Sequence, residues 1–313
     1  MYKTVSTALQ SKQVRLIIPI IILGSLTYVF WRNVNSFEIF SWHLLRDHAL
    51  LLVLICVLTF VNLYFEMKKW ITLINSPVVN QKSAFRGVLL GMCSGFVTPN
   101  RLGEFAGRSA ALPKAARKKG ALMTFAGSGI QGFVTLIAGI IGLIFYPILP
   151  QLASFAKLMP KVFYAILIIA AIAAIFLWLK KPLKPHFATV LKHLKSIRPH
   201  ILVKAWFWAV ARYAVFSTQF VLALYCVGFT GDVWLCYTGV FLLYFCQSYF
   251  PFTAMGELGV REVLAIFIFG AFLPEAILAA LASLIVWVAN IGIPVLTGLF
   301  NMKRSKIRIL GNS

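Results

Sequence analysis

Long apolar segments, repeated along the whole chain, constrain this sequence more than any other feature. Apolar runs of 15 to 30 residues recur from Leu16 to Phe300. A helix needs about 20 residues to cross the hydrocarbon core of a bilayer. The runs are continuous and lack the alternation of a membrane β-barrel. They predict an all-α polytopic membrane protein, with residues 1–313 forming a single membrane domain.

The apolar runs fall into two kinds. Two stretches, 84–112 and 234–272, are each interrupted by a proline and a glycine-rich charged segment. We expect each to form a re-entrant or broken helical hairpin. Eight complete spans remain an alternative, because they would leave both chain ends on the same side of the membrane as six spans do. The remaining runs predict six full transmembrane helices, at 16–31, 49–65, 121–149, 162–179, 205–228 and 276–300.

The thirty Lys and Arg residues sort by position relative to these spans. Twenty-two lie in alternate gaps, among them Lys68, Lys69 and the segment 180–204, and only four lie in the opposite gaps. Basic residues concentrate on the cytoplasmic side of membrane proteins. The pattern predicts an integral protein of the cytoplasmic membrane with both termini in the cytoplasm. It also explains the net charge of +22 without nucleic acid as a partner.

The two interrupted stretches share a sequence pattern. Segment 98–108 is TPNRLGEFAGR and segment 251–261 is PFTAMGELGVR, so both contain G-E-x-x-x-R at an offset of 153 residues. The same offset carries the predicted helices around each stretch onto one another. The charge pattern has the two stretches enter from opposite faces. We therefore predict an inverted repeat, with units 49–149 and 202–302, which in transporters places the substrate site at the repeat interface.

At these motifs the chain resembles the transmembrane region of lysylphosphatidylglycerol synthases and its stand-alone, flippase-like relatives. The family's first motif is roughly P-G-R-x-G-E followed by a basic residue, and here Asn100 replaces its usual glycine. The second motif is roughly G-G-x-G-x-x-E, and here Glu257 stands where glycine is common. The matching residues are Pro99, Arg101, Gly103, Glu104, Arg108, Gly256, Gly259 and Glu262.

The resemblance covers nearly the whole chain and implies lipid translocation. Family members fused to a soluble transferase domain both modify a lipid and move it across the bilayer. This chain ends thirteen residues after its last predicted span, so we expect a stand-alone member without that domain. The implied partners are membrane lipids with a phosphate headgroup, aminoacylated or glycosylated among them, and a lipid-modifying transferase encoded separately.

Ionisable side chains within membrane segments usually face a partner, a cavity or a substrate. One interpretation is structural: Glu104 with Arg108, and Glu257 with Arg261, are each four residues apart and could neutralise one another. The functional interpretation makes the arginines ligands for a lipid phosphate, because guanidinium matches phosphate oxygens. The candidate substrate-binding residues are Arg101, Glu104, Arg108, Arg212, Glu257, Arg261 and Glu262, and the candidate helix-breaking residues are Pro99, Gly103, Pro251, Gly256 and Gly259.

Two roles stay open among these candidates. Glu104 and Glu262 could accept an ammonium headgroup or carry a coupling proton. Arg212 lies alone in the fifth predicted span, where it either pairs with a motif glutamate or extends to the headgroup layer.

Three classes of function are compatible with the sequence. The leading one is a lipid translocase without catalysis of its own, needing neither cofactor nor metal. No nucleophile and base constellation, metal ligand set or nucleotide loop supports the second, a membrane-embedded headgroup transferase. The third is a non-catalytic partner that recruits a lipid-modifying enzyme through its basic loops.

Overall fold

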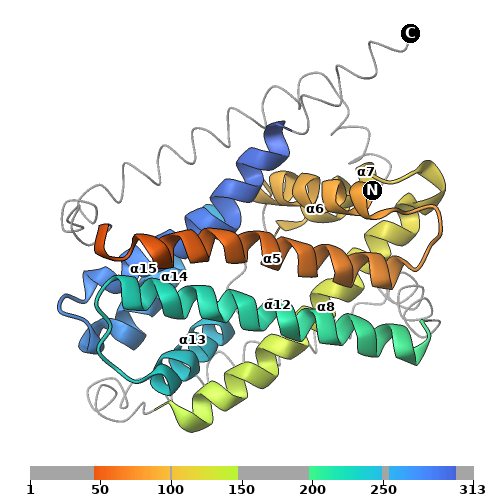
Figure 1. The fold of residues 1–313 in the computed structure, drawn as a ribbon. Coiled ribbons are helices and arrows are strands. Elements are labelled where there is room, and N and C mark those ends of the chain that lie inside the picture. The colour runs from red at the N-terminus through yellow and green to blue at the C-terminus, as the bar shows by residue number, and fades with distance from the viewer. Residues whose placement is uncertain (1–45, 99–100, 147–196, 249–253, 301–313) are drawn as a thin grey trace, which may run out of the picture.

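The fold is built from packed helices, some of which run side by side while others cross them obliquely (Figure 1). The computed structural model describes residues 46–98, 101–146, 197–248 and 254–300. The helices among them are α5 (Ala49–Ile74), α6 (Gln81–Phe96), α7 (Gly103–Ala110), α8 (Arg117–Phe145), α12 (Pro199–Cys226), α13 (Val233–Gln247), α14 (Ala254–Phe269) and α15 (Ile277–Trp287). Beyond α15 the chain stays helical through a π-helical turn, Val288–Gly292, to Phe300.

Four of the predicted spans are confirmed as helices long and apolar enough to cross a membrane. They are Ala49–Ile74, Lys114–Phe145, Pro199–Cys226 and Ile277–Phe300. The predicted spans 16–31 and 162–179 lie outside the described residues, as do Pro99 and Pro251. The predicted end of the second span at residue 65 is wrong, because α5 continues to Ile74, where Asn75 takes a left-handed conformation. Asparagine tolerates that conformation better than most residues.

Both interrupted stretches fold as pairs of short helices. The first becomes α6, with 16 residues, and α7, with 8. The second becomes α13, with 15 residues, and α14, with 16. At a rise of about 1.5 Å per residue, these helices are about 12 to 24 Å long, shorter than a hydrocarbon core of about 30 Å.

Side-chain caps define where two of these short helices begin. The Asn80 side chain accepts a hydrogen bond from the Ser83 N–H at 2.8 Å, at the start of α6. The Asp232 side chain accepts one from Leu235 N–H at 2.8 Å, at the start of α13. Each cap satisfies a backbone donor that the first helical turn leaves without a partner.

The long helices α5 and α12 lie side by side and run antiparallel (Figure 1). Gln219 of α12 donates to the Ile55 carbonyl near the beginning of α5, at 2.9 Å. Trp208, earlier in α12, packs its ring on Phe65, later in α5, with ring centroids 5.7 Å apart. Residue numbers thus rise along one helix as they fall along the other, which places the end of α5 beside the start of α12.

The last helix of each half packs on the hairpin of its own half and also contacts the hairpin of the other half. The backbone of α8 comes so close to α13 that a Cβ on Gly142 would lie 2.8 Å from the Thr238 carbonyl oxygen. Near the end of the last helix, a Cβ on Gly298 would lie 2.9 Å from the Leu89 carbonyl oxygen of α6. Small residues allow such close approach of helices, which is typical of packing in membranes.

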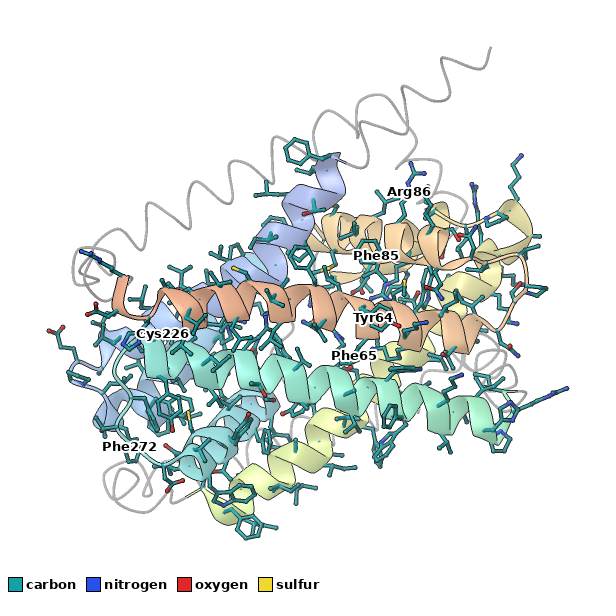
Figure 2. All side chains as sticks on the ribbon, in the orientation of Figure 1. Tyr64, Phe65, Phe85, Arg86, Cys226 and Phe272 are labelled. Atoms are coloured by element: carbon teal, nitrogen blue, oxygen red, sulfur yellow. The ribbon has the colours of Figure 1, made fainter. Side chains whose placement is uncertain are left out.

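Contacts between turns identify the two ends of the helix bundle. At one end, the Lys119 ammonium donates to the Asn75 carbonyl at 3.3 Å, joining the end of α5 to the start of α8. At the other end, the Thr230 N–H donates to the Phe272 carbonyl at 3.3 Å. Figure 2 shows Cys226 and Phe272 together at that second end, with Arg86 toward the first. Within the described residues, the basic segment 114–119 and the predicted outer turns at 230–232 and 273–275 therefore lie at opposite ends.

The outward faces of the long helices carry large apolar side chains (Figure 2). A soluble monomer rarely exposes so continuous an apolar surface, because water would have to cover it. The surface is compatible with contact to lipid, as expected for a membrane protein. Examples more than half exposed are Leu50, Phe60, Phe133, Phe145 and Phe207.

A glycine in α7 provides a test of this packing. A Cβ on Gly107 would lie 2.0 Å from the Ser94 hydroxyl oxygen and 2.5 Å from the Leu90 carbonyl oxygen of α6. We expect Gly107→Ala to separate α6 from α7 and to destabilise the protein by about 1–3 kcal/mol, as overpacking typically does. The measurement is the thermal midpoint of the detergent-purified protein by size-exclusion chromatography.

The matched control is Gly129→Ala in α8, where a Cβ would meet no atom within 4 Å. The same substitution should be neutral or stabilising there, because alanine favours a helix by about 1 kcal/mol over glycine. Equal midpoints for the two variants would contradict the close approach of α6 and α7.

Candidate functional site

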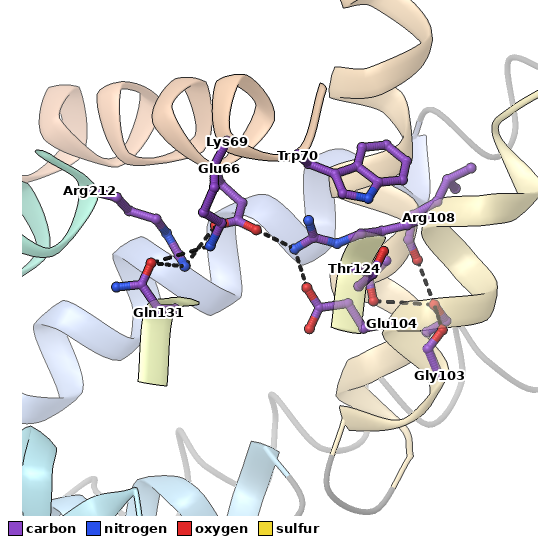
Figure 3. Close-up of polar contacts among 12 residues, drawn as sticks. Glu66, Lys69, Trp70, Gly103, Glu104, Arg108, Thr124, Gln131 and Arg212 are labelled. Carbon is purple, nitrogen blue, oxygen red and sulfur yellow. Dashed lines mark hydrogen bonds and ion pairs between the residues drawn. The ribbon is translucent and has the colours of Figure 1, made fainter. Parts of the chain in front are cut away.

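A buried carboxylate, Glu66 of α5, is the centre of a cluster of charged side chains (Figure 3). Its Oε1 lies 2.7 Å from Nη2 of Arg108 on α7. Its Oε2 lies 2.7 Å from Nζ of Lys69 and 2.8 Å from Nη1 of Arg212 on α12. One carboxylate thus joins three cations from three helices, in surroundings where an unpaired charge is costly.

Arg108 is held from several sides, so its guanidinium already has partners. It forms an ion pair with Glu104, one turn earlier in α7, as well as with Glu66. Its guanidinium carbon also lies 5.6 Å from the ring centroid of Trp70. The predicted pairing of Glu104 with Arg108 is confirmed. Arg108 therefore anchors the first hairpin to α5 rather than facing an empty space.

Gly103 and its neighbours explain how α7 is positioned. The Gly103 N–H donates to the Thr98 hydroxyl at 2.8 Å, and the Gly103 carbonyl accepts from the Ser94 hydroxyl at 2.8 Å. A Cβ on Gly103 would lie 2.2 Å from the Ser94 carbonyl oxygen, so only glycine fits. The predicted break at Gly103 is confirmed, since α7 begins there.

Arg212 continues the charged cluster into a chain of amide side chains. Its Nε donates to Asn62 Oδ1 at 2.9 Å, and Asn62 Nδ2 donates to Asn290 Oδ1 at 2.6 Å. Asn290 lies in the π-helical turn and donates to Gln219 Oε1 at 3.0 Å. Neither predicted role of Arg212 matches, because its partner is Glu66, a glutamate outside the motifs. The extension of α5 past residue 65 is what brings Glu66 within reach.

A pocket of about 280 Å³ opens beside this cluster. Arg101 lies just before α7, and α13 with α14 contribute Gln247 and Glu257, so residues of both interrupted stretches meet here. The full lining among the described residues is Arg101, Gln131, Thr135, Arg212, Tyr213, Phe216, Tyr244, Gln247, Ser248 and Glu257.

Arg101 has unused hydrogen-bonding capacity at the pocket. It takes a left-handed backbone conformation, with φ of 55°, which is uncommon for a residue with a side chain. Its Nε is buried and has no hydrogen-bond partner among the described residues. Arg101, Arg212 and Glu257 are thus the predicted site residues that the structure brings together at the pocket.

The remaining predicted residues lie elsewhere. Arg261 is 1% exposed and donates to the hydroxyl and the carbonyl of Ser283 on α15, at 2.9 and 2.8 Å. Glu262 is buried beside it in α14. The prediction that Gly256 and Gly259 break a helix is wrong, because α14 begins at Ala254 and runs through both. The break lies upstream, between α13 and α14, and a helix accepts single glycines at a modest cost.

Two residues of the cluster were missed by the sequence reasoning. Lys69 was assigned to a cytoplasmic gap, but its side chain is 2% exposed inside the bundle. Glu66 was not considered at all. The signal available was the apolar segment WITLI at 70–74, which continues the helical pattern beyond both residues. Their spacing of three residues also matches an ion pair on one helix face.

The cluster and the pocket together carry four cations and three anions. The cations are Lys69, Arg101, Arg108 and Arg212, and the anions are Glu66, Glu104 and Glu257. A surplus positive charge in a confined site favours binding of an anion. Among the described ranges, no group of three or more His, Cys, Asp and Glu residues could hold a metal ion.

Removing the central carboxylate tests whether it holds the cluster together. We expect Glu66→Gln to destabilise the protein by about 3–5 kcal/mol, because it leaves buried cations without their shared anion. The double variant Glu66→Gln with Arg212→Gln should recover part of that loss, because the stability changes caused by substitutions at contacting residues are not additive. The measurement is thermal unfolding in detergent, with the exposed Glu275→Gln as control.

A Glu66→Gln midpoint equal to that of Glu275→Gln would show that the buried ion pairs do not stabilise the fold.

The chain was compared with family models, with curated proteins and with solved structures. None of the three comparisons gives a significant match. The interpretation of the site therefore rests on its own geometry and on the motifs quoted above.

Proposed function

We propose that this chain is a lipid translocase that moves a phosphate-bearing headgroup across the cytoplasmic membrane. The observation that supports it best is the pocket formed where the two interrupted stretches meet, lined by Arg101, Arg212 and Glu257. Transporters with broken helices place their substrate sites at such a meeting point. The motif resemblance to flippase-like proteins agrees with this interpretation.

The charges at the pocket suit a phosphate. Guanidinium groups bind phosphate oxygens through two parallel hydrogen bonds, and such charge-assisted bonds are among the strongest in proteins. Arg101 has an unpartnered Nε at the pocket, and Arg212 also lines it. Arg108 and Arg261, both considered as phosphate ligands from the sequence, are absent from the pocket lining. We therefore assign the phosphate to Arg101 and Arg212.

The surroundings suit transfer of a headgroup while the acyl chains stay in lipid. The pocket is small, and the outer faces of α5, α8 and α12 are apolar. In the proposed mechanism the two hairpins approach the pocket from opposite faces of the bilayer as units of an inverted repeat. A change in their packing then exposes the headgroup to one leaflet after the other.

The membrane topology is part of the proposal. We place the end of the bundle with Asn75 and Lys119 in the cytoplasm, because the basic gaps gather there, and the turn at 273–275 outside. The lengths of α6, α7, α13 and α14 favour six spans with two hairpins over eight complete spans.

Cysteine labelling of a cysteine-free background tests this topology. We expect Glu275→Cys to react with a membrane-impermeant maleimide on intact cells, because the position is exposed at the outer end. Lys118→Cys, exposed at the opposite end, should react only after permeabilisation. Reaction of both from the same side would exclude the proposed orientation.

Headgroup transfer in proteoliposomes tests the function. Fluorescent phospholipid of the inner leaflet should become accessible to an external quencher faster with protein than without. We expect Arg101→Gln to slow the initial rate about 10- to 100-fold, since a hydrogen bond to a charged group contributes about 1.5–3 kcal/mol. Arg101→Lys should restore the rate only in part, because it keeps the charge without the fork.

The matched control is Arg198→Gln, which removes an exposed arginine outside the pocket and should transfer at the normal rate. Normal transfer by Arg101→Gln would rule out the assigned phosphate ligand. A native protein no faster than empty liposomes would rule out translocation.

A further inference from the structure

The pocket walls contain buried polar atoms that bond to nothing in the described protein. Arg101 Nε, the Tyr244 hydroxyl and Gln247 Oε1 all lack a hydrogen-bond partner among the described residues. Buried polar groups of native proteins are nearly always paired, so a cluster of unpaired ones indicates a ligand or ordered water. Arg101 offers a donor, Gln247 an acceptor, and the tyrosine hydroxyl serves as either.

This mixture of donors and acceptors identifies the kind of group that would satisfy it. A phosphate has only acceptor oxygens at its anionic end, so it can satisfy Arg101 but not Gln247 Oε1. An alcohol hydroxyl both donates and accepts, and several hydroxyls can satisfy Gln247 and Tyr244 together. The Gln247 amide nitrogen donates to Glu257 at 2.9 Å, which fixes its oxygen as the free acceptor.

Aromatic rings form the wall beside these polar atoms. Phe216 and Tyr244 stack with centroids 4.4 Å apart, and Tyr213 meets Tyr244 edge to face at 6.3 Å. The stacking fixes the ring that carries the Tyr244 hydroxyl. Three of the ten lining residues are aromatic, and aromatic rings beside placed polar groups are common in sites for small molecules.

The charges around the pocket disfavour a phosphodiester headgroup that also carries an ammonium group. The site and its adjoining cluster carry one surplus positive charge. A phosphodiester brings one negative charge and leaves the site neutral if the rest of the headgroup is uncharged. A phosphodiester bearing an ammonium has no net charge, so the surplus would remain, and an unbalanced buried charge is costly.

We propose that the pocket binds an anionic phosphodiester whose second substituent is an uncharged polyol, such as glycerol, inositol or a sugar. That the phosphodiester belongs to a lipid rests on the proposed translocase function. Arg101 and Arg212 bind the phosphate, while Tyr244 and Gln247 bind hydroxyls of the polyol. Glu257 orients the Gln247 amide and limits the positive charge to a surplus of one.

Lipid retention by the purified full-length chain tests the proposal. The protein is reconstituted in nanodiscs containing equal amounts of phosphatidylglycerol, phosphatidylinositol and phosphatidylethanolamine, and retained lipids are counted by native mass spectrometry. The two polyol lipids should be retained about tenfold or more over phosphatidylethanolamine. Phosphatidylethanolamine would leave one buried charge uncompensated and would lack several hydrogen bonds. Equal retention would overturn the proposal.

Tyr244→Phe removes the unpaired hydroxyl and keeps the ring stack. We expect it to reduce the preference for polyol lipids about two- to tenfold, as for one neutral hydrogen bond. The matched control is Tyr237→Phe, on the same helix, whose hydroxyl pairs with Thr218 at 2.8 Å and is absent from the pocket lining. Equal effects of the two variants would overturn the assignment of Tyr244.

Glu257→Gln tests the role of the net charge at the pocket without changing Tyr244. It raises the surplus to two positive charges, so the pocket should now retain phosphatidic acid, a phosphomonoester, over phosphatidylglycerol. An unchanged order of retention would overturn the charge assignment. A soluble competitor, glycerophosphoglycerol, distinguishes a lipid ligand from a free headgroup. If the competitor displaces bound phosphatidylglycerol only at a large molar excess, the ligand is a lipid. If the competitor and the lipid bind with equal affinity, the assignment of a lipid ligand is overturned.

The outcomes distinguish this inference from the proposed function. Translocation without selectivity for polyol headgroups would overturn the inference alone. Selective retention without translocation would leave the pocket assignment standing and would remove the translocase.

Discussion

The arrangement depends on one buried carboxylate. Glu66 accepts contacts at 2.7 to 2.8 Å from Lys69, Arg108 and Arg212, which reach it from α5, α7 and α12 (Figure 3). Three cations confined among helices would repel one another strongly without it, because the low effective dielectric magnifies their interaction. The carboxylate thereby attaches the first interrupted hairpin to the long helices of both halves of the chain.

The position of the pocket follows from this attachment. Arg108 holds α7 against α5, and Arg101, just before α7, then lies at the pocket with Gln247 of α13 and Glu257 of α14. Arg212 belongs to both environments, since it pairs with Glu66 and lines the pocket. The amide chain from Asn62 through Asn290 to Gln219 extends the connection to the last helix. Binding of an anion at Arg212 would therefore perturb contacts among α5, α12 and the last helix.

The candidate site was predictable only in part. The shared G-E-x-x-x-R pattern singled out both interrupted stretches, and residues of both do meet at the pocket. Among the motif arginines, however, the sequence does not distinguish Arg101, which lines the pocket, from Arg108 and Arg261, which bind Glu66 and Ser283. The distinction depends on Glu66 and Ser283, which lie 42 and 22 residues away from their partners in the chain. No local pattern predicts such distant pairs.

The sequence by itself determined that the chain is helical, that it has helices long and apolar enough to cross a membrane, and that its basic residues collect in alternate gaps. These properties follow from apolar run length and local charge, which act over one helix at a time. Only the tertiary structure decided which buried charges neutralise one another, that α5 extends to Ile74, and that Arg101, Arg212 and Glu257 share a pocket. Charge pairing depends on distances of a few ångströms between helices, and packing sets those distances.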